Sequence, residues 1–284
     1  MRYLAIFILF IGMFCLFYFY RAEISNFFFR LPQIRQDTTK FVIEETKKEI
    51  FVPPPLRALI EAPEAFLTNA GIIEWTNVQR IENGLSALSW NPELDTAASL
   101  KVQNMLDRQY FSHVSPDGLG PDYWVQKAGY EYIVIGENLA LGNFKDDKEL
   151  VGAWMQSEGH RTNILNPKFR EIGVAVKKGI FEGKQTWLAV QIFGKPLSSC
   201  PQPDASLKTR IETANEQLLS LKSSLETLRA EIENMRPRRG PDYKQKVEDY
   251  NALVLKYNAL VEETKILIAV YNDQVQVFNA CVSQ

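Results

Sequence analysis

The chain has 284 residues, a formal net charge of −2 at pH 7 and a pI near 5.9, with 46% hydrophobic and 23% charged residues. This length suits one globular domain with an additional module, and the composition is ordinary for a soluble domain. The slightly acidic balance lacks the electrostatic footprint of a nucleic-acid-binding protein, so we expect no nucleic-acid partner.

The N-terminal segment is apolar, because residues 3–20 include no charged side chain. This predicts a transmembrane helix over residues 1–22, at the lower end of the length that spans a bilayer. A cleaved signal peptide is the alternative, but its cleavage site needs small residues. Here Phe17-Tyr18-Phe19-Tyr20 leads into Arg21, and such aromatic residues suit a membrane interface. We therefore expect an uncleaved, single-pass anchor.

The orientation of this anchor is not decided by charge. Arg2 precedes the apolar segment, whereas Arg21, Arg30 and Arg35 follow it, which by itself favours a cytoplasmic body. Large domains translocate largely regardless of such charges. We give more weight to the cysteines and to the family resemblance described below, both of which predict a cell-membrane protein with an extracytoplasmic domain.

Residues 23–66 are predicted to be a juxtamembrane linker. Pro53, Pro54 and Pro55 lie within it, and a proline run is stiff, extended and poor in backbone donors. The sequence therefore indicates a spacer here rather than a folded element.

Residues 67–197 have the pattern of a globular α+β domain. Apolar spacing predicts a helix over 72–81, and Asn91 before Pro92 predicts the capped start of a second helix. A third helix is expected over 146–156. Strands are expected over 172–176 and 186–193, joined by a turn within 179–184. Helices followed by an antiparallel pair of strands indicate a layered α+β fold.

Residues 204–284 predict an antiparallel coiled-coil hairpin. Apolar residues recur at alternating spacings of about three and four, in two runs separated by Arg236-Pro237-Arg238-Arg239-Gly240-Pro241. The first run is Leu207, Ile211, Ala214, Leu218, Leu221, Leu225, Leu228, Ile232 and Met235, and the second is Val247, Tyr250, Val254, Tyr257, Val261, Thr264, Ile268, Tyr271, Val275 and Phe278. Self-association through this hairpin is an open alternative to an intramolecular role.

Two of the three cysteines flank the predicted hairpin, while Cys15 lies in the apolar anchor. An antiparallel hairpin brings its two ends together, so Cys200 and Cys281 are placed to form a disulfide. Such a bond persists in an oxidising compartment, which favours the extracytoplasmic orientation. Two unrelated free thiols are the alternative.

The only two histidines lie in short polar motifs. His113 is in Phe111-Ser112-His113, and His160 is in Trp154-Met155-Gln156-Ser157-Glu158-Gly159-His160-Arg161-Thr162-Asn163. Gly136-Glu137-Asn138-Leu139-Ala140 lies between them. Imidazole is suited to proton transfer and metal ligation near neutral pH. His113, Glu137, Glu158 and His160 are therefore the candidate site residues.

These motifs, with Leu88-Ser89-Trp90-Asn91-Pro92 and Ile172-Gly173-Val174-Ala175, resemble the CAP superfamily of cysteine-rich secretory, antigen 5 and pathogenesis-related proteins, also called the SCP domain. The resemblance covers about residues 70–196 and is closest to the bacterial branch. It implies an α-β-α sandwich with a cleft lined by two histidines and two glutamates, and in some members the histidines bind zinc.

His113, Glu137 and His160 match that pattern directly. The second glutamate of the pattern is absent from its usual place, so either Glu158 substitutes for it or the site is a triad. Zn²⁺ held by His113 and His160 is one interpretation, although catalytic zinc usually has three protein ligands. A purely structural histidine–glutamate network is another.

The sequence thus predicts a membrane-anchored, extracytoplasmic cell-envelope module. Its cleft is expected to bind a lipid, cell-wall or protein ligand, with the hairpin as an interaction surface or spacer. The alternative is a metal-assisted hydrolase acting on extracellular peptide or cell-wall material. Whether the protein is an enzyme is left open. A serine nucleophile at Ser112 or Ser115 is disfavoured, because no glycine-elbow serine is visible.

Overall fold

The computed structural model describes residues 48–59 and 61–283. The predicted anchor at 1–22 lies outside these residues. Within the described part, no helix is both long and apolar enough to cross a membrane. The chain divides into two compact units.

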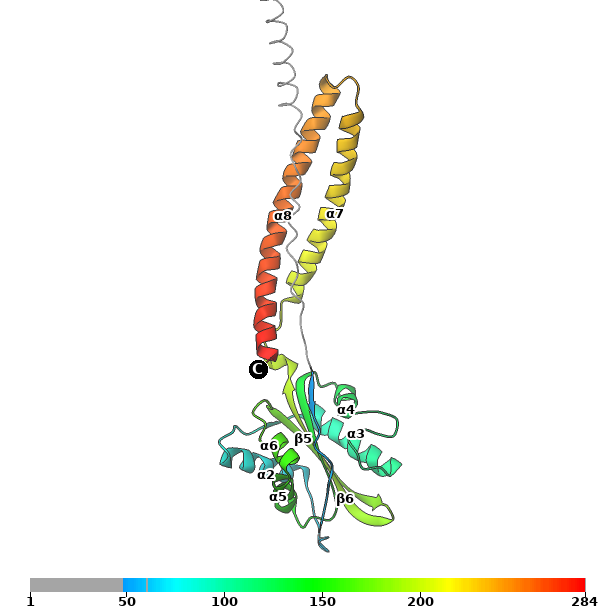
Figure 1. Ribbon diagram of the computed structural model, residues 1–284, viewed down its shortest axis with the longest axis vertical. Coiled ribbons are helices and arrows are strands. Elements are labelled where there is room, and N and C mark those ends of the chain that lie inside the picture. The colour runs from blue at the N-terminus through cyan, green and yellow to red at the C-terminus, as the bar shows by residue number, and fades with distance from the viewer. Residues whose placement is uncertain (1–47, 60, 284) are drawn as a thin grey trace, which may run out of the picture. The chain divides into compact units, whose positions relative to one another are not determined.

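A mixed β-sheet forms the centre of the first unit (Figure 1). Its strands follow the order β1-β4-β6-β5-β3, and β2 also pairs with β4. Their bounds are β1 Glu49–Phe51, β2 Leu56–Arg57, β3 Ser89–Trp90, β4 Tyr132–Leu141, β5 Glu171–Phe181 and β6 Lys184–Pro196. The long strands β4, β6 and β5 are antiparallel neighbours, whereas β1, β2 and β3 pair in parallel.

The predicted antiparallel pair is present and longer than expected. β5 and β6 stay paired from Glu171–Gly194 to Phe181–Lys184. The turn is confined to Glu182 and Gly183, both with positive φ. Both strands extend beyond their apolar centres into polar residues. These residues show no alternating hydrophobic pattern, so the sequence predicted strands that are too short.

Helices cover both faces of this sheet (Figure 1). On one face, α3 and α4 share an apolar core with Ile135, Leu139 and Val190. On the other, α2, α5 and α6 pack with Val134, Ala140 and Phe193. Alternate residues of one strand point to opposite faces, which explains why neighbours on β4 belong to different cores. The bounds are α2 Asn69–Glu82, α3 Pro92–Arg108, α4 Pro121–Lys127, α5 Asp147–Gln156, α6 Glu158–Ile164 and the 3₁₀ turn η1 Leu197–Ser199.

The helix starts agree with the sequence. Asn91 is the N-cap of α3 and accepts a hydrogen bond from the backbone N–H of Leu94, with Pro92 as the first helical residue. Asp146 caps α5 in the same way through the N–H of Glu149. Each cap satisfies a donor that the helix itself leaves free.

The predicted linker over 23–66 is wrong for its later part. β1 pairs with residues 134–136 of β4, and β2 pairs with residues 140–141. The three prolines suppressed any strand signal, but they fall between the two short strands, where no ladder bond is needed. Residues 49–57, here called the strap, therefore contribute two short strands to the sheet.

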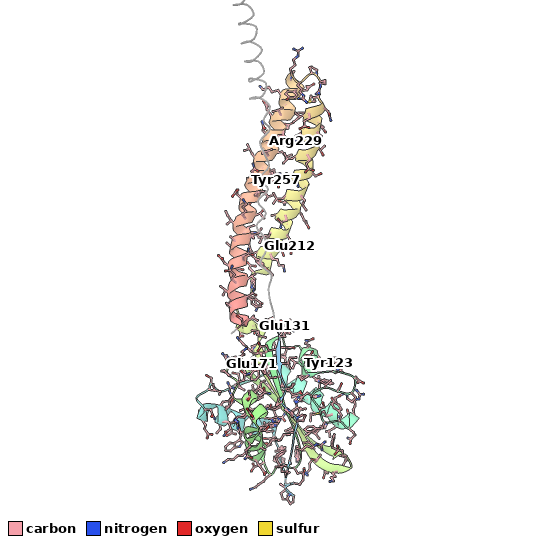
Figure 2. The ribbon with its side chains drawn as sticks, viewed as in Figure 1. Tyr123, Glu131, Glu171, Glu212, Arg229 and Tyr257 are labelled. Carbon is pink, nitrogen blue, oxygen red and sulfur yellow. A yellow bond between two sulfur atoms is a disulfide. The ribbon has the colours of Figure 1, made fainter. Side chains whose placement is uncertain are left out.

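The second unit is a helical hairpin of α7 Ala205–Asn234 and most of α8 Pro241–Val282. Leu225 and Ile232 of α7 share a buried cluster with Tyr250, Val254 and Tyr257 of α8. Figure 2 labels Arg229 on α7 and Tyr257 on α8. The helices end and restart on either side of the predicted break. The hairpin is confirmed, while coiled-coil packing in the strict sense stays a prediction.

Cys200 and Cys281 form a disulfide, as predicted, with a sequence separation of 81 residues. Both belong to the same unit as the sheet, because the end of α8 from Gln274 onward is grouped with it. Cys200 is buried beside Ile133 and Phe278.

Candidate functional site

Strand β4 supplies the centre of the site. Glu137 and Asn138 are fully buried, although the rest of this strand is almost entirely apolar. Because they are adjacent in an extended strand, their side chains point to opposite faces of the sheet. Glu137 lies on the side of α3, and Asn138 lies on the side of α6. The site is therefore built from both layers around one strand.

His113 approaches Glu137 from the loop after α3. The two atoms His113 Nδ1 and Glu137 Oε1 are 2.7 Å apart, and both side chains are buried. The other ring nitrogen, Nε2, lies 2.5 Å from the backbone carbonyl oxygen of Pro53. A carbonyl oxygen only accepts hydrogen bonds, so Nε2 carries the proton in this contact.

Lys101 holds the loop that carries His113. Its side chain is completely buried in α3, and its ammonium donates to the carbonyls of Ser112 and His113 at 2.7 and 2.8 Å. Burial lowers the pKa of Lys101 to about 8, while the nearby charge of Glu137 opposes this shift. Burial raises the pKa of Tyr110, a further partner of this ammonium, to about 12. Sequence reasoning missed Lys101, since a lysine in an amphipathic helix usually faces solvent.

His160 lies on α6 and is also buried. Its Nδ1 is 2.8 Å from the hydroxyl of Ser157. Burial, with a smaller contribution from the charge of His113, lowers the pKa of His160 to about 4. His160 is therefore neutral near pH 7, with one ring nitrogen that bears a proton and one that bears a lone pair.

Amide side chains fix α6 against the sheet. The amide nitrogen of Asn163 donates to Asn138 Oδ1 at 3.0 Å, and Asn138 donates to Gln191 Oε1 at 3.0 Å. Gln191 in turn donates to the hydroxyl of Thr76 on α2 at 2.7 Å. The sequence contained a sign of this hydrogen-bond network, because the polar residues Asn138 and Gln191 interrupt otherwise apolar strands. Asn163 thus links α6 to β4.

Two polar atoms within this site are buried without a hydrogen-bond partner among the described residues: Glu137 Oε2 and His160 Nε2. A buried polar atom left without a partner costs free energy, typically 1–3 kcal/mol. Native proteins contain few such atoms, and each asks for an explanation. Both of these belong to residues that the sequence singled out.

Glu158 differs from the other candidates. It is exposed at the first turn of α6, whereas the carboxylate that contacts His113 is that of Glu137. The structure thus brings His113 and Glu137 together, places His160 in electrostatic range of His113, and leaves Glu158 at the surface. Ser115, one of the two disfavoured nucleophiles, accepts a hydrogen bond from the backbone of Leu119. Trp154 is fully buried.

The residues present fit a metal ion only in part. Over the described ranges, no group of three or more histidine, cysteine, aspartate or glutamate residues has metal-binding geometry. His160 Nε2 and Glu137 Oε2 have the chemistry of ligands and have no hydrogen-bond partner within residues 48–59 and 61–283. His113 Nε2, in contrast, is engaged by Pro53. A Zn²⁺ site at His113 and His160 is thus still a proposal.

The family model for "CAP: Cysteine-rich secretory protein family" matches residues 73–193. Those residues form a CAP domain of the bacterial kind, as the resemblance predicted. The match begins after the strap and ends before η1.

Two curated proteins of Bacillus subtilis (strain 168) are similar to this chain. The "Uncharacterized protein YkwD" is 42% identical over 124 residues, which are 44% of this chain and 46% of that protein. The "Uncharacterized membrane protein YlbC" is 33% identical over 107 residues, which are 38% of this chain and 31% of that protein. The chain therefore spans less than half the length of these relatives.

Among solved structures, an extracellular protein with an SCP domain from Bacillus anthracis str. Ames is 29% identical, with a TM-score of 0.39. The similarity covers 45% of this chain and 40% of that one.

Proposed function

We propose that this protein is a membrane-anchored, extracytoplasmic module of the cell envelope whose CAP domain binds a ligand at His113, Glu137 and His160. The Cys200–Cys281 disulfide supports an oxidising compartment. The apolar residues 3–20 and the membrane-protein name of one relative support the anchor.

The observation that carries the binding role is a pair of buried atoms, Glu137 Oε2 and His160 Nε2, that have no hydrogen-bond partner in the part of the chain that the structure describes. A ligand or ion that accepts from or donates to these atoms would remove the cost of leaving them unpaired. A purely structural network explains them less well, because a network that only stabilises the fold gains most when every member is satisfied.

A metal is the simplest ligand to test. His160 and Glu137 would supply an imidazole nitrogen and a carboxylate oxygen, and bound Zn²⁺ lowers the pKa of a coordinated water. The experiment is calorimetric titration of Zn²⁺ into the full chain in detergent. We expect binding that His160→Ala abolishes and that Glu158→Gln, a change at the exposed carboxylate, leaves intact.

If Zn²⁺ does not bind, the same chain is titrated with lipid vesicles, cell-wall fragments and peptides. Failure of every class to bind both the wild-type chain and a variant whose strap is weakened by Phe51→Ala and Glu49→Ala would overturn the proposed function. Trp fluorescence checks that the domain is folded. All five tryptophans lie within residues 67–197, so this signal reports on the CAP domain.

A metal-assisted hydrolase is the second candidate. The neutral state of His160 favours it, because an unprotonated imidazole is a metal ligand or a general base at pH 7. The test is hydrolysis of peptide or cell-wall substrates with and without added Zn²⁺. Turnover that persists in folded His160→Ala would exclude this role.

For the hairpin, we propose an interaction surface. Leu219, Leu255 and Ile266 are large apolar side chains that are more than half exposed on it. Light scattering of the full chain in detergent tests self-association. A mass that equals one chain would exclude it.

A further inference from the structure

The strap lies along the outer edge of β4 and leaves a gap in its pairing. Phe51 is opposite Gly136, and Leu56 is opposite Ala140. The residues in between, Val52 to Pro55, pass the stretch of β4 that begins at Glu137 without forming a ladder. The three prolines therefore lie beside the part of β4 that carries Glu137.

The residues of the site hold the strap by its backbone carbonyls. His113 Nε2 binds the carbonyl oxygen of Pro53 at 2.5 Å, and the amide nitrogen of Asn163 donates to that of Phe51 at 3.2 Å. A Cβ added to Gly159 would lie 2.6 Å from the Cβ of Pro53. Pro53 thus contacts both histidine-bearing segments, the loop after α3 and the start of α6.

Two apolar side chains and two ion pairs fix the strap at its ends. The rings of Phe51 and Phe169 meet edge to face, with centroids 6.3 Å apart, and Leu56 packs on the same core. Glu49 pairs with Lys168 at 2.9 Å, and Arg57 pairs with Glu182 at 3.3 Å. These contacts define a pattern of an acid, an aromatic residue, a proline, an aliphatic residue and a base.

Several of the side chains and ion pairs that attach the strap are partly exposed. Ile50 and Val52 are 40% and 45% exposed. The Arg57–Glu182 pair is exposed and the Glu49–Lys168 pair is partly exposed, and exposed ion pairs stabilise little. The strap also lies outside the matched CAP domain of residues 73–193. Without it, β4 would be an open sheet edge, and such an edge binds an added extended strand.

We propose that the outer edge of β4, with His113, Asn163 and Gly159, is a groove for extended proline-containing peptides, which the strap occupies in cis. The ligand is a partner protein segment with an aromatic residue two positions before a proline and an aliphatic residue three positions after it. An acidic residue precedes this core and a basic residue follows it, opposite Lys168 and Glu182. This inference rests on the proposed binding role and names its ligand class.

Proline suits this groove for a physical reason. The ladder is absent between the two short strands, so no backbone N–H is required there, and proline has none. A proline run is also already extended, so binding it costs little conformational entropy. His113 and Asn163 read carbonyl oxygens, which proline retains.

The test uses the full chain in detergent and a fluorescent peptide with the sequence of residues 48–59. Phe51→Ala with Glu49→Ala removes the ring contact and one ion pair from the strap but leaves the groove unchanged. A self-occupied groove reduces apparent affinity by the fraction of chains in which it is open. Fluorescence anisotropy should therefore show binding at least tenfold tighter to this variant than to wild type.

Matched controls distinguish binding in the groove from non-specific binding of the peptide. Ile50→Ala, a change at an exposed strap residue, should bind the peptide as wild type does. A peptide with alanine in place of its phenylalanine, and a scrambled peptide, should bind at least tenfold more weakly to the strap-weakened variant. Equal binding of all three peptides overturns the proposal.

Hydrogen exchange over residues 49–57 shows whether the strap has left. If the strap is released in the variant but the peptide does not bind, the proposal of a peptide groove is overturned. It is also overturned if the strap stays protected from exchange and peptide binding does not increase. If the double variant does not fold, an excess of isotope-labelled peptide should still accelerate exchange of the strap in wild type, and unchanged exchange refutes displacement. Zn²⁺ or lipid binding without peptide binding would retain the proposed function and reject this inference alone.

Discussion

The CAP domain and the helical hairpin bury different kinds of side chain. The hairpin core consists of aliphatic and aromatic residues, and its buried Thr264 bonds to the carbonyl of Leu260 one turn earlier. The CAP domain, in contrast, buries several charged and amide side chains: Arg80, Lys101, Glu137, Asn138, His113, His160, Asn163 and Gln191. Burying polar groups costs free energy unless each is paired. This buried polar network therefore distinguishes the CAP domain from the hairpin, whose core is mainly apolar.

The largest effect is expected from the disulfide. Replacing Cys200 and Cys281 by serine frees a loop of 81 residues, which should cost about 4 kcal/mol in the chain-entropy model. Chemical unfolding is followed by circular dichroism for the helices and by Trp fluorescence for the CAP domain. A midpoint unchanged by either probe would show that the two ends of the loop are held by packing alone.

Core truncation in the hairpin should separate the two regions. Leu225 is fully buried, so Leu225→Ala should cost about 3 kcal/mol through lost contacts and a cavity. Helical circular dichroism should show this loss while Trp fluorescence does not. Leu219→Ala on the same helix, where leucine is 69% exposed, should change stability by less than about 0.5 kcal/mol. Matching losses in both signals would mean that the regions unfold as one.

Removing the buried ammonium should destabilise the CAP domain. Lys101→Met leaves the carbonyls of Ser112 and His113 without their donor, which should cost about 2 kcal/mol. The loss should appear in Trp fluorescence and leave the helical signal of the hairpin unchanged. Lys177→Met, at an exposed position of β5, is the matched control. A stabilised Lys101→Met variant would mean that desolvation of the charge outweighs its hydrogen bonds.

The pH dependence of stability should also belong to the CAP domain. The pKa of His160 is about 4 in the folded protein and near 6.5 in the unfolded chain. Between these values the unfolded state binds more protons, so stability is full above pH 6.5 and falls as pH drops toward 4. His160 contributes at most about 1.4 kcal/mol per pH unit.

Unfolding of wild type and His160→Asn at several pH values isolates this contribution. The variant should have a shallower slope between pH 6.5 and 4, while Ser157→Ala, which retains the imidazole, should keep most of the wild-type slope. Identical slopes for wild type and His160→Asn would assign the acid sensitivity to other groups.

Residues alone determined much of this protein. The periodicity of Leu225 and Val254 predicted the hairpin because a helical face repeats locally, and Cys200 and Cys281 followed from its antiparallel geometry. Residue type and motif identified His113, Glu137 and His160 as candidates. Asn91 before Pro92 predicted the start of a helix, because an N-cap is a local signal.

The tertiary structure decided the rest. The burial of Lys101 and the hydrogen bond from His113 to the carbonyl of Pro53 depend on contacts between residues from different elements, which no local pattern encodes. Glu158 and Glu137 are the same residue type, and both lie in motifs that the sequence singled out. Only the packing of β4 against the loop after α3 buries Glu137, because strand position and layer order, rather than residue type, determine which charge is removed from water.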